Sequence, residues 1–184
     1  MNVFANKEIV QNYDDYYTTD FGKKVNQVEE RLIKSLVQDI PRLRVLELGC
    51  GTGHWTKIFL DMGFEVTATD ISEPMLTAIR NKQLNAKIKI IDASEIPYED
   101  DNIDIVAGIT MLEFVSDQQK VIDEIYRVLK PGGWLILGCL NAESTLAKNS
   151  DSDQVFKNAK FLTQARLKKM LGNFSRIKFQ NGVH

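Results

Sequence analysis

A glycine-rich turn with a carboxylate in front of it is the part of this sequence best suited to bind a ligand. It lies in the stretch VLELGCGTGHW (45–55), and its glycines are Gly49, Gly51 and Gly53. Glycine permits a positive φ, and its missing side chain lets a ligand lie against bare backbone. Turns of this kind, between a strand and a helix, usually hold a nucleotide. The chemistry expected at this turn depends on whether its ligand is a nucleotide with phosphate or a nucleoside without it.

The spacing of the turn argues against a phosphate. A dinucleotide fingerprint reads G-x-G-x-x-G, and His54 stands where its third glycine would be. Glu47 stands two residues before the first glycine, close to where a pyrophosphate would lie. A negative charge there repels phosphate and attracts an ammonium or sulfonium group.

Two more carboxylates stand at matching places along the chain. Asp70 ends the apolar stretch FEVTATD, and Asp92 ends the stretch AKIKIID. A carboxylate at the first position can accept both hydroxyls of a ribose, and one at the second can accept from an exocyclic amine such as adenine N6. Either residue alone could equally cap a helix or a turn. Three carboxylates at successive strand ends, beside a glycine turn, favour a nucleoside site.

The elements that must position these residues follow from the hydrophobic pattern. Stretches rich in Val and Ile are predicted as strands over 43–48, 64–70, 86–92, 102–109 and 133–140. Apolar spacings of three and four predict helices over 25–37 and 117–129, and Ser72-Glu73-Pro74 is typical of a helix start. Alternating strands and helices give parallel pairing through right-handed crossovers. We therefore expect a Rossmann-like, doubly wound α/β sheet, with ligands at the carboxyl ends of the central strands.

Composition and charge narrow the class of protein further. The chain has 184 residues, 43% of them hydrophobic, which suits one globular domain with its own core. Its two cysteines, Cys50 and Cys139, predict neither a disulfide framework nor a zinc cluster, and no metal site is expected. The absence of a long apolar run and of an apolar leader predicts a cytoplasmic protein with no membrane span.

The charge is unevenly distributed along the chain. The net charge of −2 gives no reason to expect nucleic acid as a partner. Residues 141–184 nevertheless hold eight Lys and Arg against three Asp and Glu. This basic segment is either a solvated helix face or a contact with an acidic substrate.

Four motifs resemble, in order and spacing, those of class I S-adenosylmethionine-dependent methyltransferases: VLELGCGTG, VTATDIS, IDASEIPYEDDNID and VLKPGGWLIL. Within that class the chain is similar to small-molecule methyltransferases related to the ubiquinone and menaquinone biosynthesis C-methyltransferases. The resemblance implies S-adenosyl-L-methionine as cofactor and a mostly parallel sheet with strand order 3-2-1-4-5-7-6. Residues 175–180 (SRIKFQ) are a plausible sixth strand, and only 181–184 follow them. We therefore expect the last strand, strand seven, to be missing.

The resemblance also implies roles for individual residues of a cofactor site. These are Glu47 and the backbone of Gly49, Cys50, Gly51 and Gly53 for the methionine amine and carboxylate, Asp70 for the ribose diol, Ile71 for packing on the adenine, Asp92 and the Ala93 backbone for the adenine edge, and Thr110 and Met111 for the methionine end.

Other polar side chains are candidates for the acceptor side of the site. They are Tyr13, Tyr16, Tyr17, His54 and Glu113. Because the cofactor already carries an activated group, the protein mainly aligns the reactants and excludes water, and a base is needed only if the nucleophile must lose a proton. Each candidate also has a plainer interpretation: lid packing for the tyrosines, a surface or capping residue for His54, and a surface carboxylate for Glu113. We assign no catalytic base.

A single domain is expected, with three parts. Residues 1–40 would form an N-terminal lid and helix, 43–140 the cofactor-binding core, and 141–184 a substrate-side loop, helix and strand. Within the first part, the tyrosine-rich residues 13–24 are expected to be a mobile lid that orders over the cofactor.

The function expected from this reading is methyl transfer to a small or lipid-like acceptor. A methyltransferase acting on a protein or RNA side chain and an inert S-adenosylmethionine-binding module remain open alternatives. The glycine spacing and Glu47 disfavour an NAD-dependent reductase. Neither the acceptor nor the oligomeric state is indicated by the sequence.

Overall fold

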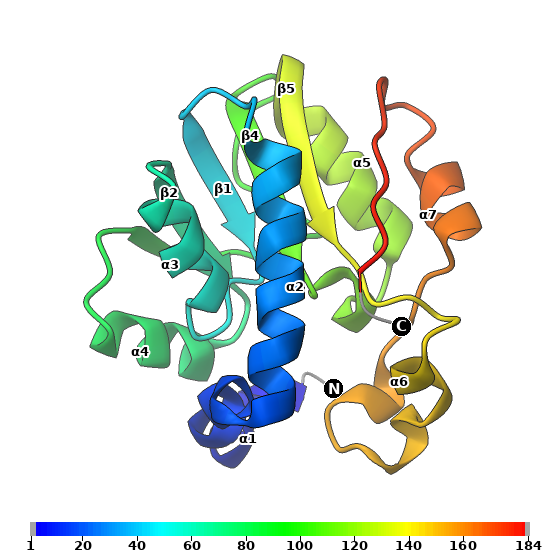
Figure 1. The fold of residues 1–184 in the computed structure, drawn as a ribbon. Coiled ribbons are helices and arrows are strands. Elements are labelled where there is room, and N and C mark those ends of the chain that lie inside the picture. Colours follow the sequence, from blue (N-terminus) through cyan, green and yellow to red (C-terminus); the bar gives the residue numbers. More distant parts are fainter. Residues whose placement is uncertain (1–2, 183–184) are drawn as a thin grey trace.

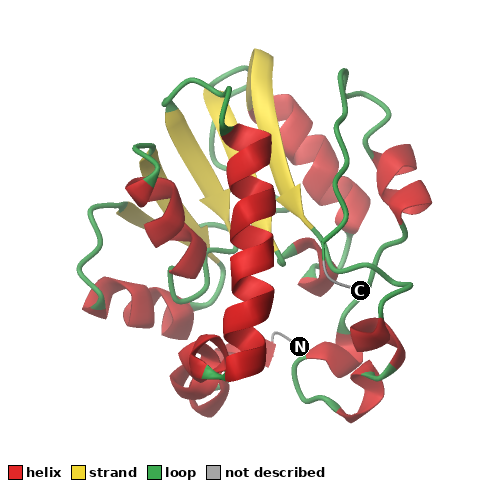
Figure 2. Ribbon diagram, in the orientation of Figure 1, coloured by secondary structure: helices red, strands yellow, loops and turns green. Residues whose placement is uncertain are grey.

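The fold is built on a parallel sheet of five strands, seen in a computed structural model that describes residues 3–182 (Figures 1 and 2). The strands are β1 (Arg44–Leu48), β2 (Glu65–Asp70), β3 (Lys87–Ile90), β4 (Ile103–Ile109) and β5 (Leu129–Gly138). Their spatial order is β3-β2-β1-β4-β5, and every pairing is parallel. This confirms the predicted doubly wound arrangement and its first five strands. The ends of the expected domain, residues 1–2 and 183–184, lie outside the described residues.

Helices connect β1 to β2, β2 to β3 and β4 to β5, whereas a loop without a helix joins β3 to β4. The α-helices are α1 (Lys7–Tyr13), α2 (Asp20–Val37), α3 (His54–Asp61), α4 (Glu73–Asn81), α5 (Gln118–Val128), α6 (Thr145–Lys148) and α7 (Gln164–Met170). Short 3₁₀ turns are η1 (Val3–Ala5), η2 (Asp14–Thr18), η3 (Leu112–Phe114), η4 (Ser150–Ser152) and η5 (Phe156–Asn158). Among residues 3–182, no helix is both long enough and apolar enough to cross a membrane.

Side-chain caps explain where the principal helices begin. The Ser72 hydroxyl accepts from the Met75 N–H at the start of α4, as the sequence predicts, and Asp117 accepts from the Lys120 N–H at the start of α5. Thr19 caps α2 in the same way by accepting from the Gly22 N–H. Since α2 therefore begins at Asp20, the last five residues of the expected lid 13–24 belong to a regular helix.

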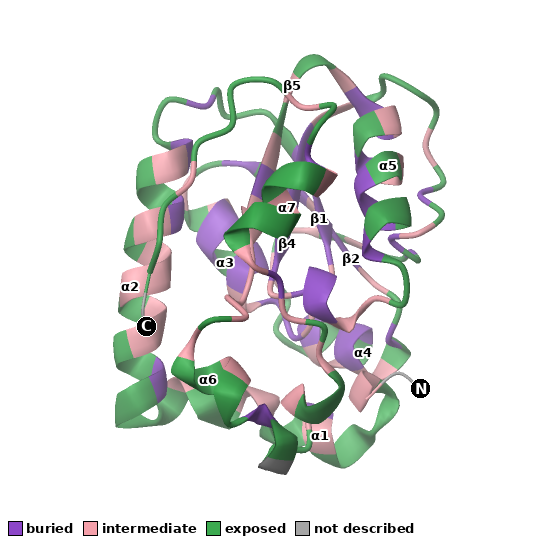
Figure 3. Cartoon of the chain, turned by 90° about the vertical axis from the view of Figure 1, so that its right-hand side faces the viewer, coloured by how far each residue is buried: buried purple, intermediate pink, exposed green. Residues whose placement is uncertain are grey.

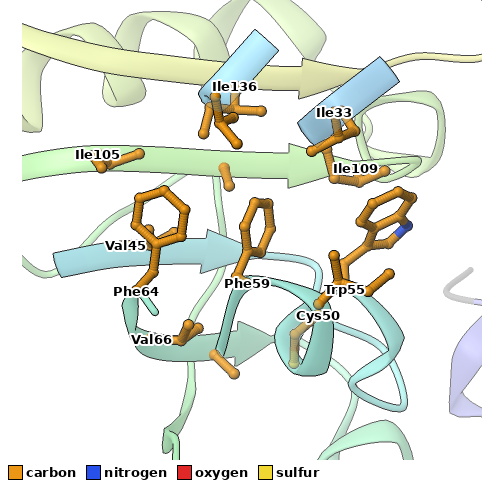
Figure 4. Packing of buried hydrophobic residues seen from close by; sticks show 14 of the residues in the cluster. Ile33, Val45, Cys50, Trp55, Phe59, Phe64, Val66, Ile105, Ile109 and Ile136 are labelled. Atoms are coloured by element: carbon orange, nitrogen blue, oxygen red, sulfur yellow. The ribbon is translucent and has the colours of Figure 1, made fainter. Parts of the chain in front are cut away.

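Alternation along the strands divides the core into two layers. On β1, Val45 faces the layer that contains residues of α2, α3 and α4, while Leu46 faces the layer that contains residues of α5 and α7. Figure 4 shows the first layer, in which Phe59 and Phe64 pack between the strands and helix α3. The helix faces turned toward the sheet are buried in both layers (Figure 3). Burial on both faces accounts for the nearly continuous apolar strands of the sequence.

The prediction of a sixth strand over residues 175–180 is wrong. Residues 175–180 form no ladder, and β5 has no second partner strand among the described residues. The segment packs its side chains elsewhere: Gln180 Oε1 accepts from the Ser35 hydroxyl of α2 at 2.9 Å, and Phe179 joins the layer of α5 and α7. Figure 1 shows this red segment running beside β5. An alternating pattern predicts an extended chain, but a strand also needs a partner in register.

The carboxyl ends of the strands point toward the end of the molecule where α1 and α6 lie (Figures 1 and 3). The glycine turn follows β1 at this end, and so do the loops after β2, β4 and β5. This arrangement places the predicted site residues on one side of the domain, where doubly wound folds bind their ligands.

Candidate cofactor site

The glycine turn after β1 is shaped by close packing at its two ends. Gly49 and Gly53 have φ of +68° and +89°, in the region that favours glycine. A Cβ atom on Gly49 would stand 2.5 Å from the Met111 Cβ, and one on Gly53 would stand 2.5 Å from the Ile79 Cγ1. These two glycines are therefore required by their neighbours as well as by their backbone conformation.

The middle glycine has different surroundings. A Cβ atom on Gly51 would meet only the Tyr13 Cε1 and the Met75 Sδ, at 3.9 and 4.0 Å. The Gly51 N–H donates to Asp70 Oδ2 at 2.9 Å, while Asp70 Oδ1 accepts from the Ser72 N–H at 2.8 Å. Asp70 thus caps its own turn, as the plainer interpretation has it, and also fixes the glycine turn. A carboxylate has about four acceptor positions, so Asp70 retains capacity for ribose hydroxyls.

Glu47 lies deep beneath the glycine turn. Its side chain is only 2% exposed, and its Oε2 accepts from the Thr56 hydroxyl of α3 at 2.6 Å. Burial raises the pKa of Glu47 to about 7, against the Thr56 hydrogen bond, and the negative charge of Asp70 raises it further. Burial likewise raises the pKa of the Cys50 thiol between these two carboxyls. The turn is therefore flanked by two acidic groups that a cationic ligand would stabilise.

The residues predicted to surround the adenine lie after β2 and β3. Ile71 is 56% exposed directly after Asp70, which leaves its side chain open to a flat ring. Asp92 lies two residues past the end of β3 rather than at its end, and it is exposed. Its Oδ1 accepts from both the N–H and the hydroxyl of Ser94 at 2.8 Å, and Ala93 is buried beside it. The observed contacts of Asp92 are those of a turn cap.

The loop after β4 reaches the glycine turn through Met111. This residue is buried and packs against the bare Cα of Gly49. Thr110 just before it has a φ of +55°, which is uncommon for a residue other than glycine, and its N–H donates to the Gly138 carbonyl at 2.7 Å. The structure therefore places Met111 against the turn and ties Thr110, one residue earlier, to the end of β5.

Glu113 is a buried carboxyl, so its interpretation as a surface residue is wrong. It is 0% exposed, and its Oε1 accepts from the Leu140 N–H at 2.5 Å. Its Oε2 is buried with no hydrogen-bond partner among the described residues, and burial raises its pKa to about 7. Its backbone carbonyl accepts from the Lys160 N–H at 2.7 Å. Glu113 thus ties the loop after β4 to both ends of the segment 140–160.

The N-terminal tyrosines lie over the glycine turn. Tyr13 contacts the Gly51 position and packs edge-on against Phe4, at 6.0 Å between ring centroids. Burial and the nearby Asp70 carboxylate raise the pKa of Tyr13 to about 12. Tyr17 stacks on His54 at 3.8 Å, and Tyr16, which is exposed, packs edge-on against Tyr17. Tyr13 and Tyr17 thus lie against the glycine turn and the start of α3, and Tyr16 packs on Tyr17.

His54 is more than a surface residue, since it begins α3 under the Tyr17 ring. Its Nε2 lies 2.6 Å from Asn26 Oδ1 of α2, and burial lowers its pKa. A cavity of about 290 Å³ opens beside it, on the α2 and α3 side of the turn. That cavity is lined by Asn26, Glu30, Gly53, His54, Lys57, Ile58, Asp61, Lys82 and Leu84. It is separate from the surface that Gly51 and Asp70 form beneath Tyr13.

Sequence reasoning missed the partners that hold these groups in place. Thr56 supports Glu47, and Asp14 joins the turn through Thr52, as described below. Neither Thr56 nor Asp14 belongs to a sequence motif that would have marked it. The one available signal was position, because Thr56 lies one turn into the helix that follows the glycines.

The buried carboxyls predict a stability that falls as the pH rises. Both Glu47 and Glu113 have a pKa raised to about 7, and that of the half-buried Glu29 is raised likewise. A carboxyl whose pKa is higher in the folded than in the unfolded chain stabilises the fold while it is protonated. Its contribution to the free energy of unfolding is therefore full below about pH 4.5 and is lost as the pH rises toward 7. We expect the thermal unfolding midpoint to be higher at pH 5 than at pH 8, because the free energy of unfolding is larger by a few kcal/mol at pH 5. Circular dichroism at both pH values measures it.

Glu113→Gln supplies the matched control, because it keeps an oxygen for Leu140 and removes one ionisation. It should flatten the slope between pH 4.5 and pH 7. Asp104 and Glu124 have lowered pKa values, so their losses occur below this window, and among residues 3–182 only His54, whose pKa burial lowers, opposes the three carboxyls within it. A wild-type midpoint that rises from pH 5 to pH 8, or a slope unchanged by the substitution, contradicts the assignment.

Comparison with known proteins agrees with this geometry. The fold and the acidic glycine turn define the class of Rossmann-like methyltransferases that use S-adenosylmethionine. Residues 46–137, half of the chain, match the family model described as "Methyltransferase domain". The chain belongs to this family.

The chain is similar in sequence to several named methyltransferases and to one uncharacterized protein. It is 31% identical over 176 residues to an uncharacterized protein of Methanocaldococcus jannaschii, covering 93% of this chain and 79% of that protein. It is 32% identical to malonyl-[acyl-carrier protein] O-methyltransferase of Serratia marcescens, covering 64% and 46% of the two chains. It is 33% identical to demethylmenaquinone methyltransferase of Renibacterium salmoninarum, covering 58% and 45%. The chain thus spans about half the length of these two enzymes.

A solved structure shows the same fold. A SAM-dependent methyltransferase of Thermotoga maritima, described as a possible histamine N-methyltransferase, superposes with a TM-score of 0.74 at 24% identity. The superposition covers 93% of this chain and 78% of that one. The predicted resemblance to class I methyltransferases, including those of menaquinone biosynthesis, is therefore confirmed.

Proposed function

We propose that this chain transfers a methyl group from S-adenosylmethionine to a small or lipid-like acceptor. The observation that carries the proposal is the pair of acidic groups, Glu47 and Asp70, on either side of a glycine turn with positive φ. Two carboxylates there disfavour a phosphate and favour a nucleoside with ammonium and sulfonium charges. The bare Cα of Gly51 and the exposed Ile71 offer two further surfaces to such a ligand.

The residues of the chain would hold the cofactor as follows. Glu47 and the turn backbone would hold the methionine end, Asp70 would accept from the ribose hydroxyls, and Ile71 would pack on the adenine. When bound, S-adenosylmethionine would supply a methyl group whose carbon is attacked in line by a lone pair of the acceptor, so that the carbon–sulfur bond breaks and a neutral thioether leaves. Tyr13 and Met111 would exclude water from this end of the turn, and Glu113 would fix the loop that carries Met111. None of these residues needs to act as a base for an acceptor whose nucleophile carries no proton.

The acceptor side lies between the loop after β4 and the segment 140–162. Gln118 Nε2 donates to the carbonyls of Leu112 and Lys160 at 3.1 and 2.7 Å, so hydrogen bonds through this side chain hold the two segments together. The ring of Phe114 packs on Phe4 at 4.9 Å and on Phe156 at 6.1 Å. These aromatic contacts favour an acceptor with apolar surface. The cytoplasmic location and the single-domain organisation remain predictions from the sequence.

Methyl-labelled S-adenosylmethionine and cell extract test this proposal. Label is expected in the small-molecule or lipid fraction, where mass analysis would identify the product. Label confined to protein or RNA would favour a macromolecular acceptor instead. Tight binding of the cofactor without any transfer would favour the inert binding module.

A further inference from the structure

The N-terminal segment crosses the glycine turn and is fastened to it at several points. The Phe4 carbonyl accepts from the Ser72 hydroxyl, at the start of α4, at 2.6 Å. Farther along the segment, Tyr13 lies over Gly51 and Tyr17 stacks on His54. The segment therefore lies across the same backbone that the cofactor would contact.

Asp14 makes two of these attachments through a single carboxylate. Its Oδ1 accepts from the Thr52 hydroxyl at 2.5 Å, and Thr52 is a buried residue within the glycine turn itself. Its Oδ2 pairs with the Lys82 Nζ at 2.6 Å, at the end of α4. One carboxylate thus joins the N-terminal segment both to the glycine turn and to the end of α4. Hydrogen bonds of this kind, with an ionised partner, are stronger than neutral ones.

The position of Asp14 in the chain determines where the Tyr13 ring lies. Asp14 follows Tyr13 directly, at the junction where α1 ends and η2 begins. Fixing the Asp14 carboxylate therefore fixes the backbone that carries the Tyr13 ring. That ring lies against Gly51 and close enough to Asp70 for the Asp70 charge to act on its hydroxyl.

We propose that Asp14 is a positioning residue of the cofactor site, which holds Tyr13 over Gly51 and slows the escape of bound S-adenosylmethionine or S-adenosylhomocysteine. The Tyr13 ring contacts the Gly51 position directly, so a nucleoside lying on Asp70 would be bordered by that ring. The nucleoside leaves only after the Asp14 contacts with Thr52 and Lys82 open. The inference concerns the cofactor of the family, so it stands apart from the identity of the acceptor.

Stopped-flow dissociation of S-adenosylhomocysteine from the full chain tests this role. In Asp14→Ala the dissociation rate is expected to rise about three- to tenfold, with little change in the association rate. Asp14→Asn keeps an oxygen for Thr52 and loses the ion pair, so its rate should fall between the two. Asp15→Ala is the matched control: Asp15 is exposed, and its backbone carbonyl accepts from the Thr18 hydroxyl. It should dissociate like the wild type.

Lys82→Ala and added salt separate positioning from a general loss of stability. The Lys82 and Asp14 side chains are 35% and 45% exposed, so salt should speed dissociation from the wild type and have a smaller effect in Lys82→Ala. The double variant should show less than the summed effects of the two single variants. Should Asp14→Ala fail to fold, Asp14→Asn and Lys82→Ala decide. Dissociation equal to the wild type in both, with unchanged salt dependence, would overturn the proposal.

Discussion

Replacing Asp70 by alanine should raise the dissociation constant of S-adenosylhomocysteine about ten- to hundredfold. A hydrogen bond to a charged group contributes about 1.5–3 kcal/mol, and one such loss at the ribose gives this range. Asp70 also holds the Gly51 N–H at 2.9 Å, so the substitution loosens the turn on which the ligand lies. Isothermal titration calorimetry measures the change directly.

Asp70→Asn separates the two roles, because it keeps one oxygen for a backbone N–H and removes the charge. Asp61→Ala is a suitable control, since Asp61 is an exposed carboxylate that pairs with Lys57 away from the turn. We expect weaker binding in Asp70→Asn and none of this effect in Asp61→Ala. An unchanged affinity in both Asp70 variants, with the fold intact, would show that Asp70 is only a turn cap.

Gly49→Ala should lower the free energy of unfolding by about 2–5 kcal/mol. A residue with a Cβ pays about 1–2 kcal/mol in the left-handed region, and Gly49 has a φ of +68°. The new Cβ would also stand 2.5 Å from the Met111 Cβ, and overpacking costs about 1–3 kcal/mol more. Urea denaturation followed by tryptophan fluorescence measures the loss.

Gly63→Ala provides the matched comparison for this substitution. Gly63 has a φ of +87°, and a Cβ there would meet nothing within 4 Å. It should therefore lose only the backbone part, about 1–2 kcal/mol. Equal losses in the two variants would show that Met111 moves away from Gly49 without cost, and that the packing at the turn is looser than described.

The parts of the fold that depend on local pattern could be predicted from the sequence. Apolar runs rich in Val and Ile gave the five strands, since a strand buried on both faces has few other compositions. The Ser72 cap and the glycine turn were also predictable, because each needs a particular residue type for a local reason. The choice of a nucleoside without phosphate followed from Glu47, which the structure places beneath the turn at 2% exposure.

The parts that depend on distant partners could not be predicted. Residues 175–180 alternate like a strand, yet their side chains bind α2 and the layer of α5 instead of extending the sheet. Glu113 reads as a surface carboxylate because nothing in the sequence places Leu140 beside it. The Asp14 contacts with Thr52 and Lys82 join positions 38 and 68 residues apart, and no local pattern encodes them.

Calorimetric titration of the full chain with S-adenosylhomocysteine, NAD and ATP tests the central claim most directly. The claim is that the turn between Glu47 and Asp70 binds a nucleoside that carries positive charge and no phosphate. S-adenosylhomocysteine, which keeps the ammonium group, should bind with a measurable affinity, while NAD and ATP should not compete for the site. NAD or ATP binding more tightly than S-adenosylhomocysteine would contradict the account.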